Sequence, residues 1–248
     1  MKLHKLTQAT HVGLRTEQED RVFILPIKRG LCIGIFDGHS GSECAQKCVE
    51  VLPEIITSLS KVPTAGLLAS AISLLHKETQ SLTSGSTASL AFIPEAADRV
   101  YVAILGDSPI VVRRADHSIW VSPEHNVGSN EAERNAAVER GGVIYLGHLQ
   151  VPDRMDIGIR MSRALGDAEL APVVNRTPEC FVHDLGEGSF VLVASDGALD
   201  PAHLHTEEHV TTLVKMIDEK CSAQDIVDRS RKEGDNVSAI LVQMREQQ

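Results

Sequence analysis

Several aspartates of this sequence stand directly after apolar segments that have the composition of buried β-strands. Segments rich in Val, Ile and Leu favour strands, so an acid behind such a segment lies at the edge of a sheet. The pattern occurs three times: LCIGIF precedes Asp37, VYVAILG precedes Asp107, and FVLVAS precedes Asp196. A fourth aspartate, Asp235, stands just before the segment VSAILVQM. Singly, each aspartate is typical of a tight turn, because Asp and a neighbouring Gly tolerate its backbone angles.

Together, these carboxylates predict a metal site. Strands of one sheet can bring their terminal acids to one rim, where the charges raise each other's pKa unless a cation neutralises them. Oxygen ligands without clustered Cys or His favour the hard ions Mg²⁺, Mn²⁺ and Ca²⁺. The calcium-loop pattern D-x-[DN]-x-[DN]-G is absent. We therefore expect Mg²⁺ or Mn²⁺, with two ions sharing a carboxylate.

Two such ions would suit the site to the hydrolysis of phosphate esters. A pair of hard cations about 3.5–4 Å apart holds a water for in-line attack on phosphorus. Arg15 can bind the phosphate through two parallel hydrogen bonds, or it can form a salt bridge with Glu19. His39 follows Asp37-Gly38 and titrates near neutrality, so it can protonate the leaving oxygen, unless its role is structural.

The elements that position these residues belong to one continuous domain, residues 1–248. No repeat, low-complexity segment or long Pro/Gly/Ser linker divides the chain. Successive strands joined by short turns favour antiparallel pairing in an α+β fold, rather than alternating βαβ units. Strands are expected at 21–27, 31–37, 87–93, 99–106, 109–114, 118–122, 143–147, 189–195 and 237–244. Helices are expected at 41–59, 64–81, 129–140, 207–218 and 222–232.

The composition excludes several classes of protein. The 248 residues include 24 Lys+Arg and 34 Asp+Glu, for a formal net charge of −10, and 42% are apolar. These values are typical of a globular chain, and the acidic balance argues against nucleic-acid binding. No apolar run reaches about 18 residues, and the first residues lack the apolar core of a signal peptide. We expect no membrane span, no secretion, and a cytoplasmic or nuclear location.

Cysteine and histidine patterns carry less chemical meaning. The five cysteines, an odd number without a C-x-x-C pair, fit a reducing compartment. Cys44 and Cys48 would share a helix face as small buried residues, with a metal or redox pair as the alternative. The segment from His205 to His209 lacks the Glu that a zinc-protease helix has directly after its first His. We interpret these two histidines as part of a solvent-exposed helix end.

The order of the motifs resembles the metal-dependent serine/threonine protein phosphatases of the type 2C family. No element is decisive alone, but seven occur in the family's order between residues 11 and 242. The segment at 129–144 also resembles the family's segment between its central strands and its flap. The seven are Arg15 with Glu19-Asp20, IFDGHSG at 35–41, GSTASLAFI at 85–93, ILGDS at 104–108, SRALGD at 162–167, VASDGALD at 193–200 and GDNVSAILV at 234–242.

The resemblance implies a set of ligands for two Mn²⁺ or Mg²⁺ ions. Asp37 would bridge the two ions, and the carbonyl oxygen of Gly38 would join one of them. Asp196 and Asp235 would hold the first ion, and Glu19 would help to hold the second.

Further roles follow from the same resemblance. Asp20 would act through metal-bound water, and Asp107 would form a weaker third site with Asp196. Arg15 would bind the phosphate, and His39 would protonate the leaving serine or threonine oxygen.

The resemblance also implies a fold and an activity. The fold would be a four-layer α/β/β/α sandwich, in which two antiparallel β-sheets are flanked by helices. The activity would be metal-dependent hydrolysis of phosphoserine and phosphothreonine in proteins, by a monomer. A pseudophosphatase that keeps the fold for protein binding is one alternative, and a Mg²⁺-dependent hydrolase of small phosphate esters is another.

Four positions depart from the family's usual residues. Ser40 replaces a Gly, Pro109 replaces a common Arg, Glu124 replaces the Asp before His125, and Leu199 replaces a frequent Trp. None of these changes removes an implied metal ligand, but Ser40 adds a side chain beside the catalytic loop.

Overall fold

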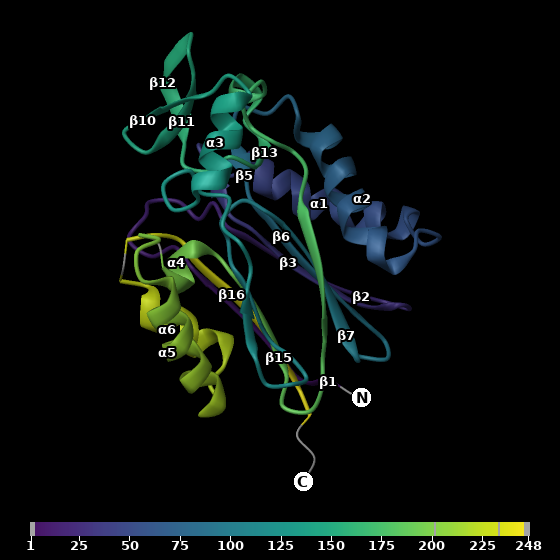
Figure 1. Ribbon diagram of the computed structural model, residues 1–248. Coiled ribbons are helices and arrows are strands. Elements are labelled where there is room, and N and C mark those ends of the chain that lie inside the picture. The colour runs from purple at the N-terminus through teal and green to yellow at the C-terminus, as the bar shows by residue number, and fades with distance from the viewer. Residues whose placement is uncertain (1–2, 201, 233, 246–248) are drawn as a thin grey trace.

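Two five-stranded antiparallel sheets face each other at the centre of the computed structural model, which describes residues 3–200, 202–232 and 234–245 (Figure 1). The first sheet contains, in spatial order, β1 (Leu3–His11), β16 (Val237–Met244), β15 (Phe190–Ala194), β8 (Ile110–Arg113) and β9 (Ile119–Val121). The second contains β14 (Glu179–Asp184), β7 (Arg99–Leu105), β6 (Ala88–Pro94), β3 (Gly30–Phe36) and β2 (Arg21–Ile27).

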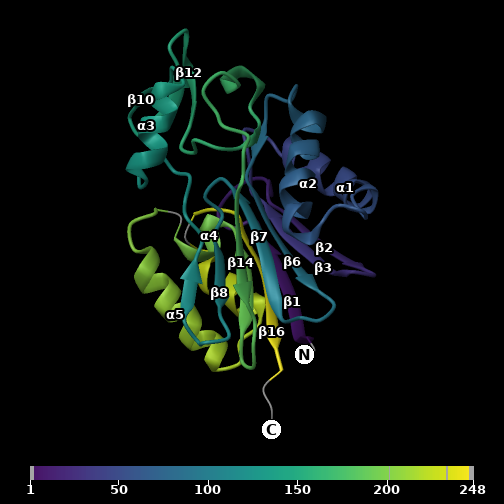
Figure 2. The same ribbon diagram turned by 45° about the vertical axis from the view of Figure 1, so that its right-hand side comes forward.

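Helices cover the outer face of each sheet, which completes the expected four layers (Figure 2). None of the described helices is long and apolar enough to cross a membrane. The second sheet is covered by α1 (Glu43–Ser58) and α2 (Thr64–Thr79), and the first by α4 (Asp196–Leu199), α5 (Thr206–Asp218) and α6 (Ala223–Ser230).

The central strands are apolar on both faces because each of them separates two buried layers. In β3, Ile33 and Ile35 point toward the opposite sheet, whereas Cys32 and Phe36 point toward α1 and α2. These near-continuous apolar segments are the ones that the sequence identified as strands.

A small lobe lies beyond one end of the sandwich. It contains a helix and a three-stranded sheet around an apolar cluster of its own. A further sheet of two-residue strands lies at the junction between the lobe and the sandwich. The lobe elements are α3 (Glu131–Glu139), β10 (Val143–Tyr145), β11 (His148–Val151) and β12 (Arg154–Ile159), and the short strands are β4 (Gly38–His39), β5 (Gly85–Ser86) and β13 (Leu165–Gly166).

The α+β class and the antiparallel pairing expected from the sequence are confirmed, and every expected strand and helix is present with ends shifted by at most two residues. The sequence missed mainly β1, β14 and the hairpin of β11 and β12. Strands β1 and β14 are edge strands with many exposed residues, so they lack the apolar composition that signals a central strand.

Truncating Phe92 tests the packing of the second sheet against its helices. Phe92 is fully buried on β6 in the cluster that includes α1 and α2. Phe92→Ala should lower the free energy of unfolding by about 3–5 kcal/mol, because it removes apolar contacts and leaves a cavity. Urea denaturation measures the change. Val182→Ala, which truncates a 53% exposed side chain on the same sheet, is the control and should cost less than about 0.5 kcal/mol.

Candidate active site

Strand topology brings four of the predicted aspartates to one end of the sandwich. Strands β3 and β7 both pair antiparallel with β6, so they run in the same direction, and Asp37 and Asp107 follow them at the same edge. Strands β15 and β16 pair antiparallel with each other, so Asp196 at the end of β15 lies beside Asp235, which precedes β16.

Burial and mutual repulsion raise the pKa values of these acids. Burial is the largest cause for Asp37, whose pKa lies well above its usual value, and the charges of Asp20, Asp196, Asp107 and Asp235 raise it further. Burial, with a contribution from Asp196, also raises the pKa of Asp20 to about 7 and that of Asp107 to about 6. Shifts of this sign indicate that the negative charges of the cluster are poorly hydrated and not fully neutralised by the groups around them.

Asp20 shows most directly that the site suits a cation. It is 3% exposed, yet neither of its carboxylate oxygens has a well-formed hydrogen bond within the described ranges of the chain. The hydroxyls of Ser195 and Ser238 lie only near enough to lower its pKa somewhat. A buried carboxylate needs a partner, and oxygen donors of this kind match Mg²⁺ or Mn²⁺. The residues present therefore fit a hard divalent ion.

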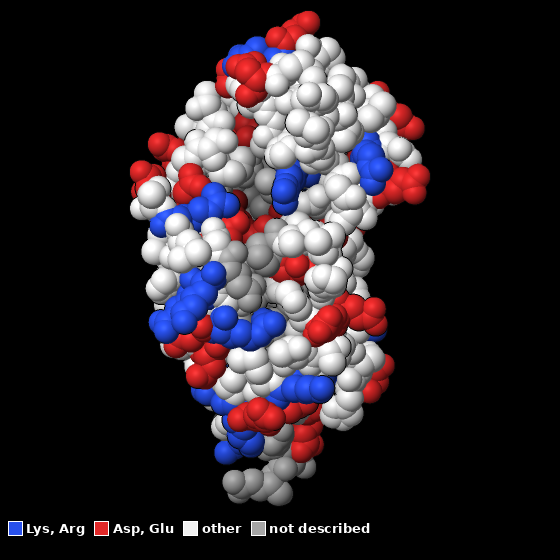
Figure 3. All heavy atoms as spheres, turned by 90° about the vertical axis from the view of Figure 1, so that its left-hand side faces the viewer, with Lys and Arg blue, Asp and Glu red and all other residues white. Residues whose placement is uncertain are grey.

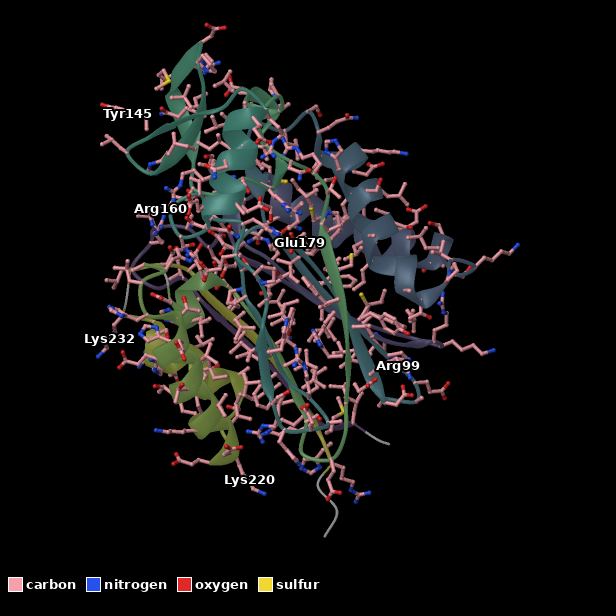
Figure 4. The ribbon with its side chains drawn as sticks, in the orientation of Figure 1. Arg99, Tyr145, Arg160, Glu179, Lys220 and Lys232 are labelled. Carbon is pink, nitrogen blue, oxygen red and sulfur yellow. The ribbon has the colours of Figure 1, made fainter. Side chains whose placement is uncertain are left out.

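No three acids of the predicted site, all of which the structure describes, have carboxylate oxygens that lie as close together as the ligands of one bound ion. In the part of the chain that the structure describes, the only three potential ligand groups with atoms within 4.8 Å of one another are His125, Glu133 and Glu179. Arg163 already forms ion pairs with both of these glutamates, one of which, Glu179, begins β14 at the end of that strand nearer the lobe (Figure 4). A cation among the predicted aspartates would have to draw them inward.

Glu19 and Gly38 lie next to each other beside this cluster. A Cβ atom on Gly38 would stand 2.6 Å from the carbonyl oxygen of Glu19, so only glycine fits there. The Glu19 Oε1 accepts a hydrogen bond of 2.6 Å from the backbone N–H of Gly41. Ser40, which lies between Gly38 and Gly41 in the chain, has a φ of 58°, in the left-handed region that favours glycine. The ligand roles of Glu19 and Gly38 stay predictions.

Arg15 contacts a predicted metal ligand rather than Glu19. Its Nη2 donates to Asp235 Oδ2 at 3.0 Å, and its Nε donates to the carbonyl oxygen of Gly234 at 3.1 Å. The Arg15 side chain is 54% exposed, so the guanidinium lies at the entrance of the site. The alternative salt bridge to Glu19 is not formed.

His39 is held by an aspartate that the sequence did not single out. Its Nε2 lies 2.9 and 3.0 Å from the two carboxylate oxygens of Asp167, which is 3% exposed. Burial lowers the pKa of His39, but the negative charge of Asp167 more than offsets this and raises it. A Cβ on Gly85 would stand 2.2 Å from His39 Nε2, so glycine leaves space for the pair. Asp167 ends the motif SRALGD, and that motif was the only signal for it.

His203 is a second residue that sequence reasoning missed. Its Nε2 lies 3.6 Å from Asp107 Oδ2 and 3.5 Å from Asp196 Oδ2, and its Nδ1 lies 3.2 Å from Glu124 Oε2. Burial lowers the pKa of His203, but these carboxylates outweigh the effect and raise it to about 10. The sequence around His203 contains no pattern that would have indicated this contact.

A cleft of about 720 Å³ opens beside the cluster. Its lining includes Glu124 and His203 from the site, Asn130 and Glu131 from the start of the lobe helix, and Thr206 from α5. Figure 3 shows acidic atoms recessed in the middle of this face of the molecule. The cleft therefore lies between the lobe and the α5 region, and it reaches the cluster only through His203, whose ring contacts Asp107 and Asp196.

The fold is shared with solved phosphatases of known type. The structure matches a serine-threonine phosphatase 2C from Toxoplasma gondii with a TM-score of 0.77, at 19% identity, over 97% of this chain and 95% of that one. It also matches the catalytic domain of the serine threonine protein phosphatase PstP in complex with two manganese ions, with a TM-score of 0.61 at 16% identity over 98% and 99% of the two chains. These likenesses define the fold as that of the 2C phosphatases.

Sequence comparison identifies the family directly. The model of the family "Protein phosphatase 2C" matches residues 12–238, and this chain therefore belongs to the protein phosphatase 2C family. A probable protein phosphatase 2C 59 of Oryza sativa subsp. japonica is 31% identical over 87% of this chain and 67% of its own length. A protein kinase and PP2C-like domain-containing protein of Arabidopsis thaliana is 28% identical over 94% of this chain but only 38% of its own length. The chain thus spans less than two thirds of several curated relatives.

Replacing Asp20 by Asn should stabilise the metal-free protein and reduce its response to Mn²⁺. The pKa of Asp20 rises from 3.8 to about 7 in the fold. Between about pH 4 and pH 7 the folded state therefore binds more protons than the unfolded state. The contribution of Asp20 to stability is lost as the pH rises through this range.

In EDTA at pH 8, Asp20→Asn should therefore unfold at a higher temperature than the wild type. Its free energy of unfolding should be larger by about 1–3 kcal/mol. Added MnCl₂ should raise the Tm of the wild type more than that of the variant. Scanning calorimetry measures both effects, with Asp98→Asn at an exposed turn as the control. A lower Tm for Asp20→Asn in EDTA would show that the Asp20 carboxylate is not under repulsion.

Proposed function

We propose that this protein is a Mn²⁺- or Mg²⁺-dependent phosphatase acting on phosphoserine and phosphothreonine in proteins, and that residues 1–248 form one catalytic domain. The observation that carries the proposal is the cluster of buried aspartates that raise one another's pKa at the end of the sandwich. Arg15 at the entrance and the His39–Asp167 pair beside the cluster supply the other groups that phosphate-ester hydrolysis needs. Membership of the protein phosphatase 2C family supports the same reaction.

Six residues would hold the two ions of the proposed site. When bound, such ions lower the pKa of a water molecule and neutralise charge on the phosphoryl oxygens. Two observations support this assignment: the Asp20 oxygens have no hydrogen-bond partner among the described residues, and the pKa of Asp37 is raised. The six are Asp37, Gly38 through its carbonyl oxygen, Asp196, Asp235, Glu19 and Asp20.

Arg15 can turn from Asp235 to a substrate phosphate at low cost. An ion pair this exposed contributes at most about 1 kcal/mol to stability, because solvent screens it. A guanidinium binds a phosphate through two parallel hydrogen bonds, which fixes the orientation of the phosphoryl group. A cation on Asp235 would also compete with Arg15 for that carboxylate. Arg15 would then be available to the substrate when the site is loaded.

In the proposed reaction, His39 would donate a proton to the leaving oxygen. Asp167 occupies Nε2, and Nδ1 is buried without a hydrogen-bond partner in the described residues. The ring is therefore held by one nitrogen, and the other remains for the substrate. We assign Nδ1 as the atom that donates the proton to the serine or threonine oxygen, and Asp167 as a residue that positions the ring.

Removing the metal or its bridging ligand should abolish activity. The purified protein should hydrolyse p-nitrophenyl phosphate with added Mn²⁺ and lose this activity in EDTA. Asp37→Asn should be inactive, and His39→Ala should lower kcat by about 10²-fold, the usual contribution of a general acid. Asp98→Asn, at the opposite end of β7 from Asp107, should keep full activity.

Other outcomes of this assay distinguish the rival functions. Robust activity in Asp37→Asn would exclude the proposed site. Mn²⁺ binding without turnover of any phosphorylated substrate would indicate a pseudophosphatase that acts by binding proteins. A higher kcat/KM for nucleotides or sugar phosphates than for phosphopeptides would indicate a hydrolase of small esters.

The positioning role of Asp167 can be separated from a structural one by a double-mutant cycle. Asp167→Asn should lower kcat by about 10-fold with little change in KM, because only the orientation and charge of His39 change. The double variant with His39→Ala should be no slower than His39→Ala alone, because both substitutions act on one group. Steady-state kinetics measure all three variants. Additive losses in kcat would exclude action through His39.

A further inference from the structure

His203 lies between two acids to which the family resemblance assigns a third ion. The residue belongs to the loop between α4 and α5, and its side chain is 6% exposed. Its Nε2 faces Asp107 at 3.6 Å and Asp196 at 3.5 Å. No other histidine in the described part of the chain forms an ion pair with a predicted metal ligand.

We propose that the His203 side chain takes the place of a third cation between Asp107 and Asp196, so that this protein binds two divalent ions rather than three. The inference rests on the proposed two-ion site, but it concerns the number of bound ions and not the reaction. It replaces the weaker third site that the sequence suggested.

The spacing of the two acids supports the replacement. Asp107, Asp196 and His203 are not among the groups whose potential ligand atoms lie within 4.8 Å of one another. Because Nε2 is within 3.6 Å of Oδ2 of both acids, these two Oδ2 atoms stand more than 4.8 Å apart across the ring. A single Mg²⁺, with ligands at about 2.0–2.2 Å, would have to draw these oxygens together, and the imidazole ring stands in the space between them.

The other side of the ring is held in place. Glu124 Oε2 lies 3.2 Å from Nδ1, and the same carboxylate accepts hydrogen bonds from Ser129 at 2.9 Å and from Thr206 at 3.3 Å. The backbone of His203 has a φ of 54°, and its N–H donates to the carbonyl oxygen of Asp200 at 3.0 Å. A residue in this conformation with an anchored ring is positioned by its surroundings rather than left at the surface.

Asp107 Oδ2, which faces His203, and the nearby Asp200 Oδ2 also have partners elsewhere in the chain. Asp107 Oδ2 accepts a hydrogen bond of 2.9 Å from the Asn126 side-chain amide. The nearby acid Asp200 uses Oδ2 to accept from the backbone N–H of His205 at 2.6 Å and from the Thr206 hydroxyl at 3.2 Å, at the start of α5. Each of these acids therefore has one oxygen that accepts hydrogen bonds, whereas neither oxygen of Asp20 has a partner among the described residues.

The number of bound Mn²⁺ ions tests the proposal. Isothermal titration of the full chain with MnCl₂, checked by equilibrium dialysis, should give two ions per wild-type chain. His203→Gly should bind three, because it empties the space between the two acids while suiting the positive φ. His203→Asn, which also tolerates that φ and is shorter, should give the same result if the glycine variant folds poorly. His205→Gly, at an exposed histidine two residues away, should still bind two.

Each other result overturns the inference in a distinct way. Three ions in the wild type and two in His203→Gly would show that Nε2 is itself a ligand of the third ion. Two ions in both proteins would show that His203 does not exclude a third. Failure of the wild type to bind any Mn²⁺ would overturn the proposed two-ion site as well, and so separates the failure of the proposed function from the failure of this inference alone.

Discussion

Repulsion among buried carboxylates is the interaction around which the end of this sandwich is organised. Asp20 is almost fully buried and Asp37 is partly buried, and the charge of Asp20 raises the pKa of Asp37. Such a cluster destabilises a fold by itself. It can be maintained only because the strands that carry it are anchored in three apolar layers, one between the sheets and one under each set of helices.

The protein compensates this repulsion unevenly. Arg15 neutralises Asp235 from the solvent side, and His203 and Asn126 contact Asp107 from the cleft side. Asp20 has no such partner within the described residues. The imbalance separates the cluster into a part that the chain satisfies on its own and a part that fits a cation. The site is therefore asymmetric before any ion binds.

The lobe is tied to this end of the sandwich by a second buried network. Arg163 bridges Glu133 on α3 and Glu179 on β14, and His125 accepts a hydrogen bond from the backbone N–H of Gly106 through Nδ1. Burial, helped by the charge of Arg163, lowers the pKa of His125 to about 4. The neutral ring therefore links the residue before Asp107 to the lobe. The lobe position and the geometry of the site are mechanically connected through these side chains.

The sequence by itself determined the central strands, their antiparallel pairing and the acids at their ends, because strand composition and chain direction are local properties. When two strands flank a common antiparallel neighbour, the aspartates that follow them must reach the same edge of the sheet, as Asp37 and Asp107 do. Edge strands such as β1 could not be predicted in this way, because many of their residues face solvent and need not be apolar.

Only the tertiary structure decided which partners the proposed catalytic groups have. Asp167 meets His39 across 128 residues of sequence, and a lone histidine such as His203 has no local pattern that reveals its neighbours. Side-chain contacts of this kind depend on how distant segments pack, and their charges matter only once burial has removed the screening by water. The acids could therefore be predicted from the sequence. The side chains that form ion pairs with them could be identified only from the tertiary structure.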